Sequence, residues 1–481
     1  MKKTIYSILA AVALLLTSCE DFTDVQPKGK NLLTTTDQLE MLLNYEYKGG
    51  VTDMRIVAGD MIYAYSNLAT EINKPQKTRS VILWTYDEAN MDKMAELTSS
   101  DEDYTYYYGL IGKVANPILS QIDAASGDDA TKKKLKCEAL TLRAWSLYML
   151  VNKFAKAYNP STAEKDPGII IMTEDKDIQE AQPKSTVQEV YDQILKDINE
   201  AIALDGLPNT AVNKMRISKP AAYAVKALTL LNMQNWDEAE AAAQQAIAIN
   251  GTINDYFNNY KGTTTGYFLG NTYDVIDRGK QGTDEDYFFN GNLEFYDPIT
   301  AEALENFEEG HVYKEKMSNL NMAYDYIMDP AEDMLGQGGF MYTYDLNSRW
   351  NDGGLRSPQM YLAIAECEVQ KGNIDNAMEY LDKVRVLRID PAKYQPLKGA
   401  VSTKADAIAH VKQVTINEEI YSSNIFIDKK RWNQLDGWKA TYSRKLVDKV
   451  YSIAPDSKMW IFPFPQNAVN NNSQLTQNYN E

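Results

Sequence analysis

The side chains best suited to bind a ligand are aromatic residues that stand beside amides and carboxylates. Three stretches have this character, and their candidate binding residues are Trp84, Tyr86, Asn90, Tyr296, Tyr344 and Trp350. Sugars present flat C–H faces that stack on such rings, while their hydroxyl groups need fixed polar partners. Brought together, these residues would form an aromatic cradle for an oligosaccharide. The alternative is that the rings fill gaps between helices, because the chain has 32 tyrosines. We predict that role, in the core, for Trp432 and Trp438.

Catalytic motifs are absent from the sequence, which has no G-x-S-x-G, no G-x-x-x-x-G-K-[ST] and no H-E-x-x-H. Acidic side chains do cluster at 101–103, 284–286 and 308–309. A glycosidase needs two carboxylates about 5–10 Å apart on opposite sides of one bond, which a sequence cannot show. Adjacent acids on a loop usually lie on a solvated face, which is the interpretation we favour. A calcium ion near 284–286 is an alternative, since hard cations bind several oxygens. We predict no catalytic residue and keep a surface glycosidase as an alternative.

Histidines and cysteines are too few and too scattered to predict a metal centre. His311 and His410 lie far apart in the sequence without a cysteine or histidine neighbour, so a zinc site of the usual kind is not expected. Cys137 and Cys367 both fall in helical-looking segments rich in alanine and leucine. This pattern favours two buried thiols, although a long-range disulfide remains open. We predict no metal and no cofactor.

The amino terminus has the anatomy of a secretory signal peptide. A basic start is followed by an apolar run over 5–16, too short to span a bilayer, and then by Thr17, Ser18 and Cys19. A bacterial signal peptidase reads this arrangement as a lipobox. We therefore predict that residues 1–18 are removed, that Cys19 is acylated, and that 19–30 form a tether. The alternative is an ordinary signal peptide with a stray cysteine.

Composition and charge describe a globular protein with an acidic surface. Hydrophobic residues make up 44% and charged residues 24% of the 481 residues, and the formal net charge is −18. No basic block occurs, so nucleic acid and anionic lipid headgroups would be repelled. No second apolar stretch approaches the length of a membrane span.

The elements that must position the candidate residues are mainly helices. Apolar residues recur at helical spacing in four stretches, which predicts helices over 36–45, 104–114, 132–156 and 187–201. Residues 49–102, which contain Trp84, Tyr86 and Asn90, keep no regular period.

An internal repeat is the most informative pattern. Residues 223–250 and 361–388 align without a gap, with Ala227 matching Ala365 and Asn235 matching Asn373. Each copy predicts a helix, a tight polar turn and a second helix, with alanines that let the two helices approach closely. Such hairpins bury their apolar faces only against a neighbour, as in tetratricopeptide repeats. Coincidental alanines in two unrelated helices are the alternative.

Between the two copies, the chain changes character. Residues 251–355 are rich in glycine, asparagine, aspartate and aromatic residues, and no helical period holds for long. A loop-rich region of this size inside a helical body is usually functional. We therefore divide the mature chain into an amino-terminal part (31–250), a variable part (251–355) and a carboxy-terminal part (356–481).

Five short motifs follow one another along the mature chain, at 19–27, 138–144, 355–366, 428–432 and 463–478. They include Arg143, Arg356 and the pair Arg431-Trp432. In this order, behind a lipobox, they resemble the SusD/RagB family of nutrient-binding outer-membrane lipoproteins over essentially the whole mature chain. Three departures suggest a divergent branch: Ser422 to Ile425 replace the family's Glu-Gly-x-Arg, a second arginine is displaced to Arg388, and the ending after Asn478 is shortened.

The resemblance implies a mainly α fold, with four tetratricopeptide-like hairpins and a loop-rich variable portion that carries the ligand site. It also implies a partner, a SusC-type TonB-dependent barrel transporter, which the lipoprotein covers as a lid and contacts through its repeat half. Substrates in the family are oligosaccharides for most members and peptides for some. The acidic pair Glu20-Asp21 resembles a sorting signal. We expect a protein anchored in the outer membrane through Cys19 and facing the exterior, with a peptide-binding lid as the alternative.

Overall fold

The computed structural model describes residues 33–45, 53–58, 68–97, 99–177, 179–259, 283–291, 303, 305–317, 351, 353–420, 422–446 and 449–478. Cys19, Tyr296, Tyr344 and Trp350 lie outside these described residues. The predicted division into three parts is not tested by the structure and stays a prediction.

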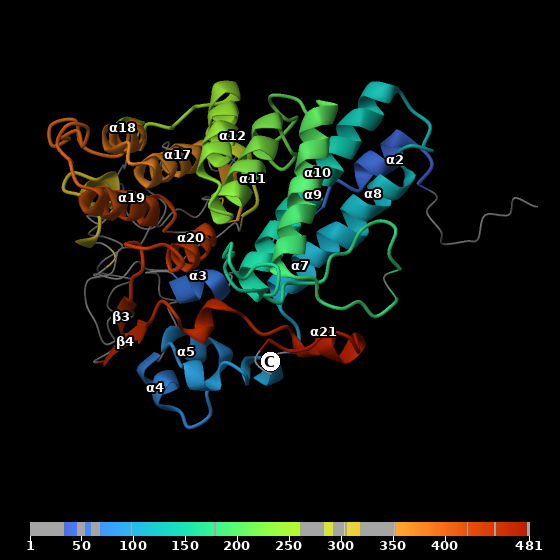
Figure 1. The fold of residues 1–481 in the computed structure, drawn as a ribbon, viewed down its shortest axis with the longest axis horizontal. Coiled ribbons are helices and arrows are strands. Elements are labelled where there is room, and N and C mark those ends of the chain that lie inside the picture. The colour runs from blue at the N-terminus through green and yellow to red at the C-terminus, as the bar shows by residue number, and fades with distance from the viewer. Residues whose placement is uncertain are drawn as a thin grey trace, which may run out of the picture.

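The described chain is mainly helical, as predicted (Figure 1). The amino-terminal part contains α2 (Thr36–Met41), α3 (Asp53–Ala58), α4 (Leu68–Asn73), α5 (Arg79–Trp84), η1 (Glu88–Asn90), α6 (Met94–Leu97), α7 (Glu102–Leu110), η2 (Ile111–Ala115), α8 (Asn116–Gln121), α9 (Asp129–Phe154), α10 (Val187–Leu204), α11 (Lys219–Asn232) and α12 (Trp236–Ile249). The remainder contains α13 (Tyr256–Asn259), β1 (Asp286–Phe288), η3 (Tyr313–Met317), β2 (Leu355–Arg356), α17 (Ser357–Lys371), α18 (Ile374–Arg385), α19 (Lys404–Glu418), α20 (Asn424–Trp432), β3 (Tyr442–Leu446), β4 (Lys449–Ile453), η5 (Lys458–Trp460) and α21 (Gln466–Asn471).

The long helices begin and end where local chemistry favours it. The Asp128 carboxylate accepts a hydrogen bond from the Thr131 amide at the start of α9, and Thr186 and Glu189 form a capping box at the start of α10. Helix α17 ends at Gly372, whose φ of +85° is a left-handed conformation that glycine adopts without steric cost. The ends of α9 and α10 predicted from the sequence agree with the structure to within a few residues.

The predicted repeat is confirmed as two helical hairpins, α11–α12 and α17–α18. Asn235 and Asn373 each precede the second helix of their hairpin, and Ala227, Ala239, Ala365 and Ala377 are fully buried. Helix α12 also packs against α17, so the two hairpins stack directly on one another. The same row continues through α9, α10 and α11, which pack in sequence (Figure 1).

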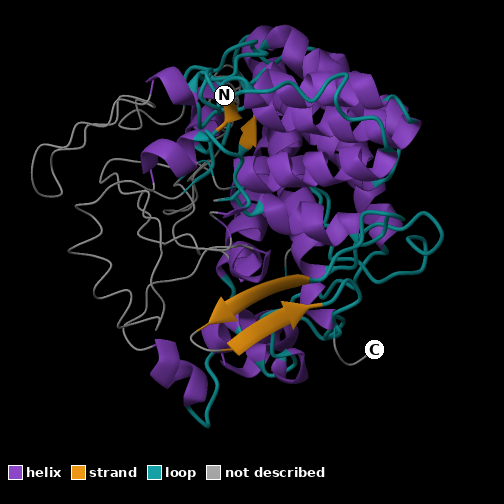
Figure 2. Cartoon of the chain, turned by 90° about the vertical axis from the view of Figure 1, so that its left-hand side faces the viewer, coloured by secondary structure: helices purple, strands orange, loops and turns teal. Residues whose placement is uncertain are grey.

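A two-stranded hairpin of β3 and β4 was not predicted. It lies below the helical body in Figure 2, and its antiparallel register pairs Tyr442 with Ile453 and Leu446 with Lys449. Residues 49–102, expected to be irregular, contain the short helices α3 to α6 where they are described.

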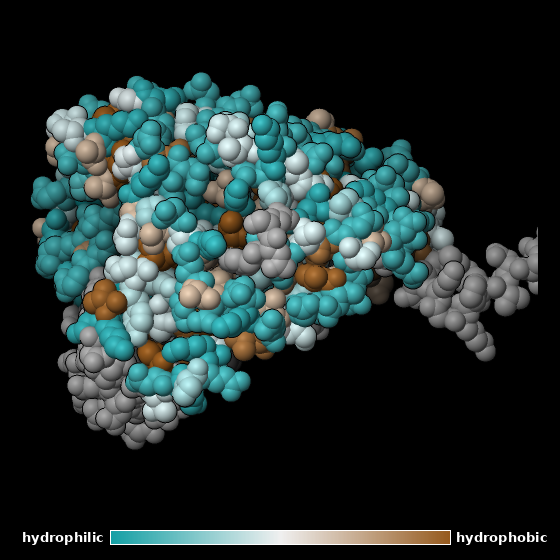
Figure 3. All heavy atoms as spheres, turned by 60° about the horizontal axis from the view of Figure 1, so that its bottom comes forward, coloured by the Kyte–Doolittle hydropathy of each residue, from teal (hydrophilic) through white to brown (hydrophobic). Residues whose placement is uncertain are grey.

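The core is continuous and includes the residues predicted for it. Trp432 and Trp438 are fully buried, and Cys137 and Cys367 are buried free thiols, so the alternative of a disulfide is wrong. The face shown in Figure 3 is largely hydrophilic, with hydrophobic residues in small separate patches. Within the described part of the chain, every helix is too short or too polar to span a bilayer.

Candidate binding site

Trp84 is not available for stacking on a ligand. It ends α5, and its side chain is 1% exposed in the hydrophobic core. The sequence prediction placed it in a surface cradle because its neighbours are polar. The structure corrects that placement, since a ring covered by protein on both faces cannot meet a sugar.

Tyr86 follows in a tight turn that closes α5. Its φ is +47°, its amide donates to the Leu83 carbonyl, and the Asp87 amide donates to the Ile82 carbonyl over 3.0 Å. This is a Schellman motif with a tyrosine where glycine is usual, and a left-handed non-glycine residue costs about 1–2 kcal/mol. The turn directs Tyr86 away from Trp84 and towards the carboxy-terminal hairpin.

Arg444 of β3 holds Tyr86 in place. Its Nε donates to the Tyr86 hydroxyl over 3.0 Å, and its guanidinium carbon lies 4.4 Å from the ring centroid. The Tyr86 hydroxyl in turn donates to the Val57 carbonyl over 3.0 Å at the end of α3. Tyr86 is half-buried, and its hydroxyl and one ring face are therefore engaged within the protein. Arg444 was not among the residues expected from the sequence, because it lies 358 residues away.

Asn90 lies at the end of η1 and is half-buried. Its Nδ2 donates to Asp87 Oδ2 over 2.7 Å, and its Oδ1 accepts from Lys93 Nζ over 2.7 Å. Both contacts are local, so the amide could exchange them for a ligand at small cost. Of the three described candidates, Asn90 is the one held by local contacts alone, so a ligand could form hydrogen bonds with its side chain in their place.

The other three candidates, Tyr296, Tyr344 and Trp350, lie in segments outside the described residues, but the chain on either side is described. Strand β1 pairs with β2, the Gly353 amide donates to the Asn290 carbonyl over 2.9 Å, and the Asn290 amide donates to Asn351 Oδ1 over 2.9 Å. The chain leads from Asn290 towards Tyr296, and Trp350 directly precedes Asn351. Both segments therefore adjoin the hydrogen-bonded pair of Asn290 and Asn351.

Hydrogen bonds from Asn351 to Asp286 and to the Phe288 carbonyl hold these two segments together. Asn351 Nδ2 donates to Asp286 Oδ1 over 2.7 Å and to the Phe288 carbonyl over 3.0 Å. Gly354 makes the close approach possible, since a Cβ there would lie 2.3 Å from the Phe288 carbonyl oxygen. Burial, with the nearby charge of Glu285, raises the pKa of Asp286. Asn351 and Gly354 were missed because nothing in their local sequence distinguishes them, and Asp286 was noted only as a member of the acidic cluster at 284–286.

Two of the three acids at 284–286 are buried and only Asp284 is exposed, which corrects the prediction of a solvated face. Glu285 and Asp286 are 1% and 4% exposed. Glu285 accepts from the Tyr256 hydroxyl over 2.5 Å and lies 3.4 Å from Arg356 Nη1 and 3.6 Å from Arg388 Nη2. Arg388, the displaced arginine of the family-like pattern, also pairs with Glu418 at 2.6 Å. These contacts tie the variable part to the carboxy-terminal part.

The cluster at 101–103 is also largely buried, contrary to prediction. Lys153 Nζ lies 2.8 Å from Asp101 Oδ2 and 2.7 Å from Asp103 Oδ2, and Arg79 Nη2 lies 2.6 Å from Asp101. The opposite charges raise the pKa of Lys153, although burial alone would lower it. Asp101, Asp103 and Glu285 therefore serve in structural ion pairs, while Glu102 is exposed. At 308–309, Glu308 pairs with buried Arg385 and only Glu309 is exposed.

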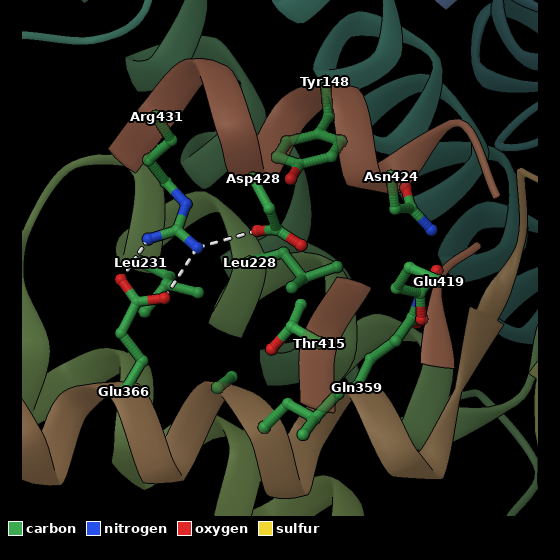
Figure 4. A pocket seen from close by; sticks show the side chains of 12 residues that line it. Tyr148, Leu228, Leu231, Gln359, Glu366, Thr415, Glu419, Asn424, Asp428 and Arg431 are labelled. Carbon is green, nitrogen blue, oxygen red and sulfur yellow. Dashed lines mark hydrogen bonds and ion pairs between the residues drawn. The ribbon is translucent and has the colours of Figure 1, made fainter. Parts of the chain in front are cut away.

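A polar cavity lies deeper in the body, between α9, α11, α17, α19 and α20 (Figure 4). Its volume of about 20 Å³ accommodates roughly one water molecule and no sugar. Arg431 and Trp432 of one family-like motif meet Glu366 of another beside it: Arg431 Nη2 and Trp432 Nε1 each donate to Glu366 Oε2 over 2.9 Å. Across the described residues, no group of three or more histidine, cysteine or acidic side chains is arranged to hold a metal ion.

Both halves of the chain match known family models. Residues 21–231 match a model described as "Starch-binding associating with outer membrane", and residues 354–480 match the model of the SusD family. No curated protein matches the chain at a significant level.

Solved structures share the fold over nearly the whole chain. A SusD superfamily protein from Bacteroides thetaiotaomicron is 18% identical with a TM-score of 0.64, covering 92% of this chain and 99% of its own. A SusD-like carbohydrate binding protein from Bacteroides vulgatus is 18% identical with a TM-score of 0.61, covering 92% and 97%. A laminarin binding SusD-like protein is 16% identical with a TM-score of 0.56, covering 92% and 97%.

Proposed function

The chain belongs to the SusD/RagB family, and on this basis we propose that it is a cell-surface lipoprotein that captures oligosaccharides and delivers them to a SusC-type TonB-dependent transporter. In this proposal it is anchored through acylated Cys19 in the outer membrane, faces the exterior and covers the transporter as a lid. The observation that carries the proposal is the match of both halves to SusD-type models, together with the fold that it shares with carbohydrate-binding relatives.

We place the ligand site at the variable part. Asn90 supplies a half-buried amide, and Tyr296, Tyr344 and Trp350 remain the proposed stacking residues. This placement is supported by the hydrogen bond between the Asn290 amide and Asn351, which holds the chain before Tyr296 and the chain after Trp350 together. Trp84 and Tyr86 are assigned a structural role rather than contact with the ligand, because Trp84 is buried and Tyr86 is held by Arg444.

We infer a binding protein and not an enzyme. Asp101, Asp103 and Glu285 are paired with buried cations, and Asp286 accepts from Thr283 and Asn351, so these carboxylates are committed to structure. A glycosidase would need two of them free across one bond.

Calorimetric titration tests the ligand class. The soluble form that begins at Glu20 is titrated with a panel of oligosaccharides and short peptides, and the same samples are assayed for hydrolysis. Saturable binding of one glycan class without turnover is expected. Binding of peptides alone would favour a peptide-capturing lid, and release of reducing ends would favour the glycosidase.

A further inference from the structure

The polar cavity between α17, α19 and α20 contains more negative than positive charge. Glu366, Glu419 and Asp428 line it, while Arg431 is the one cation among the described residues of its wall. Arg356 reaches Glu419 from outside over 2.9 Å but is shared with Glu285, and Arg388 is committed to Glu418 and Glu285. Buried charge of one sign is costly unless an opposite charge accompanies it.

One carboxylate oxygen in this cavity has no partner. Glu419 is 1% exposed, and its Oε2 makes no hydrogen bond within the described part of the chain, whereas its Oε1 accepts from Arg356. An orphaned buried acceptor costs about 1–3 kcal/mol, more when it is charged. A partner for this atom, which the described residues do not supply, would remove that cost.

The other polar groups around the space are oxygen-rich. Figure 4 shows Tyr148, Asp428 and Asn424 on one side of the space and Glu366 and Gln359 on the other, with Thr415 and Glu419 between them. Carboxylate, hydroxyl and amide oxygens are the ligands that hard cations prefer. Glu419 also follows directly on α19, and the carboxy-terminal end of a helix favours positive charge.

We propose that this cavity binds one small monovalent cation of sodium type, held by Glu419 and Asp428. Its volume of about 20 Å³ admits a single particle the size of a water molecule. A monovalent ion suits two carboxylates and neutral oxygens better than a divalent ion, because Arg431 already offsets part of the negative charge. The Asp428 side chain is 18% exposed and provides the way in from solvent.

Thermal unfolding of the soluble mature chain tests the proposal. At neutral pH and constant ionic strength, replacing choline chloride by sodium chloride should raise the midpoint saturably, by about 1–2 °C. Glu419→Gln and Asp428→Asn should abolish the sodium dependence, and Glu379→Gln, a half-exposed acid paired with Lys398, should keep it.

Two results would overturn the site. Equal midpoints in sodium and choline would mean that water alone fills the cavity, and a rise with calcium but not sodium would contradict the monovalent class. If either variant is too unstable to melt cleanly, broadening of the sodium-23 resonance by the unaltered protein and by Glu379→Gln gives an independent reading. Absence of broadening would likewise contradict the proposal.

Discussion

Asn351 Nδ2 donates a hydrogen bond of 2.7 Å to Asp286 Oδ1, which joins the two ends of the chain that flank the proposed stacking residues. We expect Asn351→Ala to lower the free energy of unfolding by about 1–3 kcal/mol, since it leaves Asp286 and the Asn290 amide with fewer partners. It should also weaken glycan binding. Urea unfolding and titration of the same samples measure both effects. Asn471→Ala, on the exposed helix α21, should change neither.

Lys153 balances the two buried aspartates at 101 and 103. Lys153→Met should lower the free energy of unfolding by about 3–5 kcal/mol, because it leaves buried carboxylates without their cation. Lys398→Met removes an exposed lysine paired with Glu379 and should cost about 0–1 kcal/mol. Equal losses in the two variants, measured by guanidinium unfolding, would show that burial of the Lys153 cluster has been overstated.

His311 gives the folded protein a sensitivity to acid. Burial, followed by the charges of Arg388 and Arg385, lowers its pKa to about 3 from an ordinary 6.5. The unfolded chain therefore binds more protons between these values, and stability falls as the pH drops from about 6.5 towards 3, by at most ~1.4 kcal/mol per unit from this group.

His311→Gln should flatten that part of the stability curve. Asp428 acts with the opposite sign, because its pKa is raised to about 6 and its folded form binds the extra proton between 3.8 and 6. The comparison must therefore be made between the unaltered protein and the variant at each pH. Parallel curves would mean that His311 is not kept neutral by the fold.

Two glycines should respond to alanine in opposite directions. Gly109 lies inside α7 with open space around the position of a Cβ, so Gly109→Ala should stabilise the protein by about 0.5–1 kcal/mol. Gly127 has a φ of +149°, and a Cβ there would lie 2.3 Å from Thr36 Oγ1, so Gly127→Ala should be destabilising. Thermal melts of the two variants check the sign of each effect.

The sequence predicts elements whose information is local and misses contacts whose information is distant. The repeated alanines of α11–α12 and α17–α18 lie at a fixed helical spacing, so both hairpins could be predicted from the sequence alone. The partner of Asp101 is Lys153, 52 residues away, and nothing beside Asp101 indicates it. Adjacent acids consequently looked solvated when they are in fact paired.

Trp84 shows the same limit at the candidate site. Its polar neighbours suggest a surface, but the left-handed turn at Tyr86 separates it from them and leaves it in the core. Arg444, which contacts the Tyr86 side chain in that turn, comes from the other end of the chain. We expect Trp84→Ala to cost about 3–5 kcal/mol of stability, as buried tryptophans do, without a separate effect on ligand binding once the protein is folded.

The most direct test of the account is calorimetric titration of Trp350→Ala with the oligosaccharide that the unaltered soluble protein binds. A control, Tyr394→Ala, alters a half-buried aromatic residue on a loop of the repeat half. The account predicts that Trp350→Ala loses most of the affinity, whereas Tyr394→Ala keeps it, even where loss of the contact between Tyr394 and Arg385 lowers the unfolding midpoint. Unchanged affinity in Trp350→Ala, or no binding of any oligosaccharide by the unaltered protein, would contradict a glycan site at the variable part.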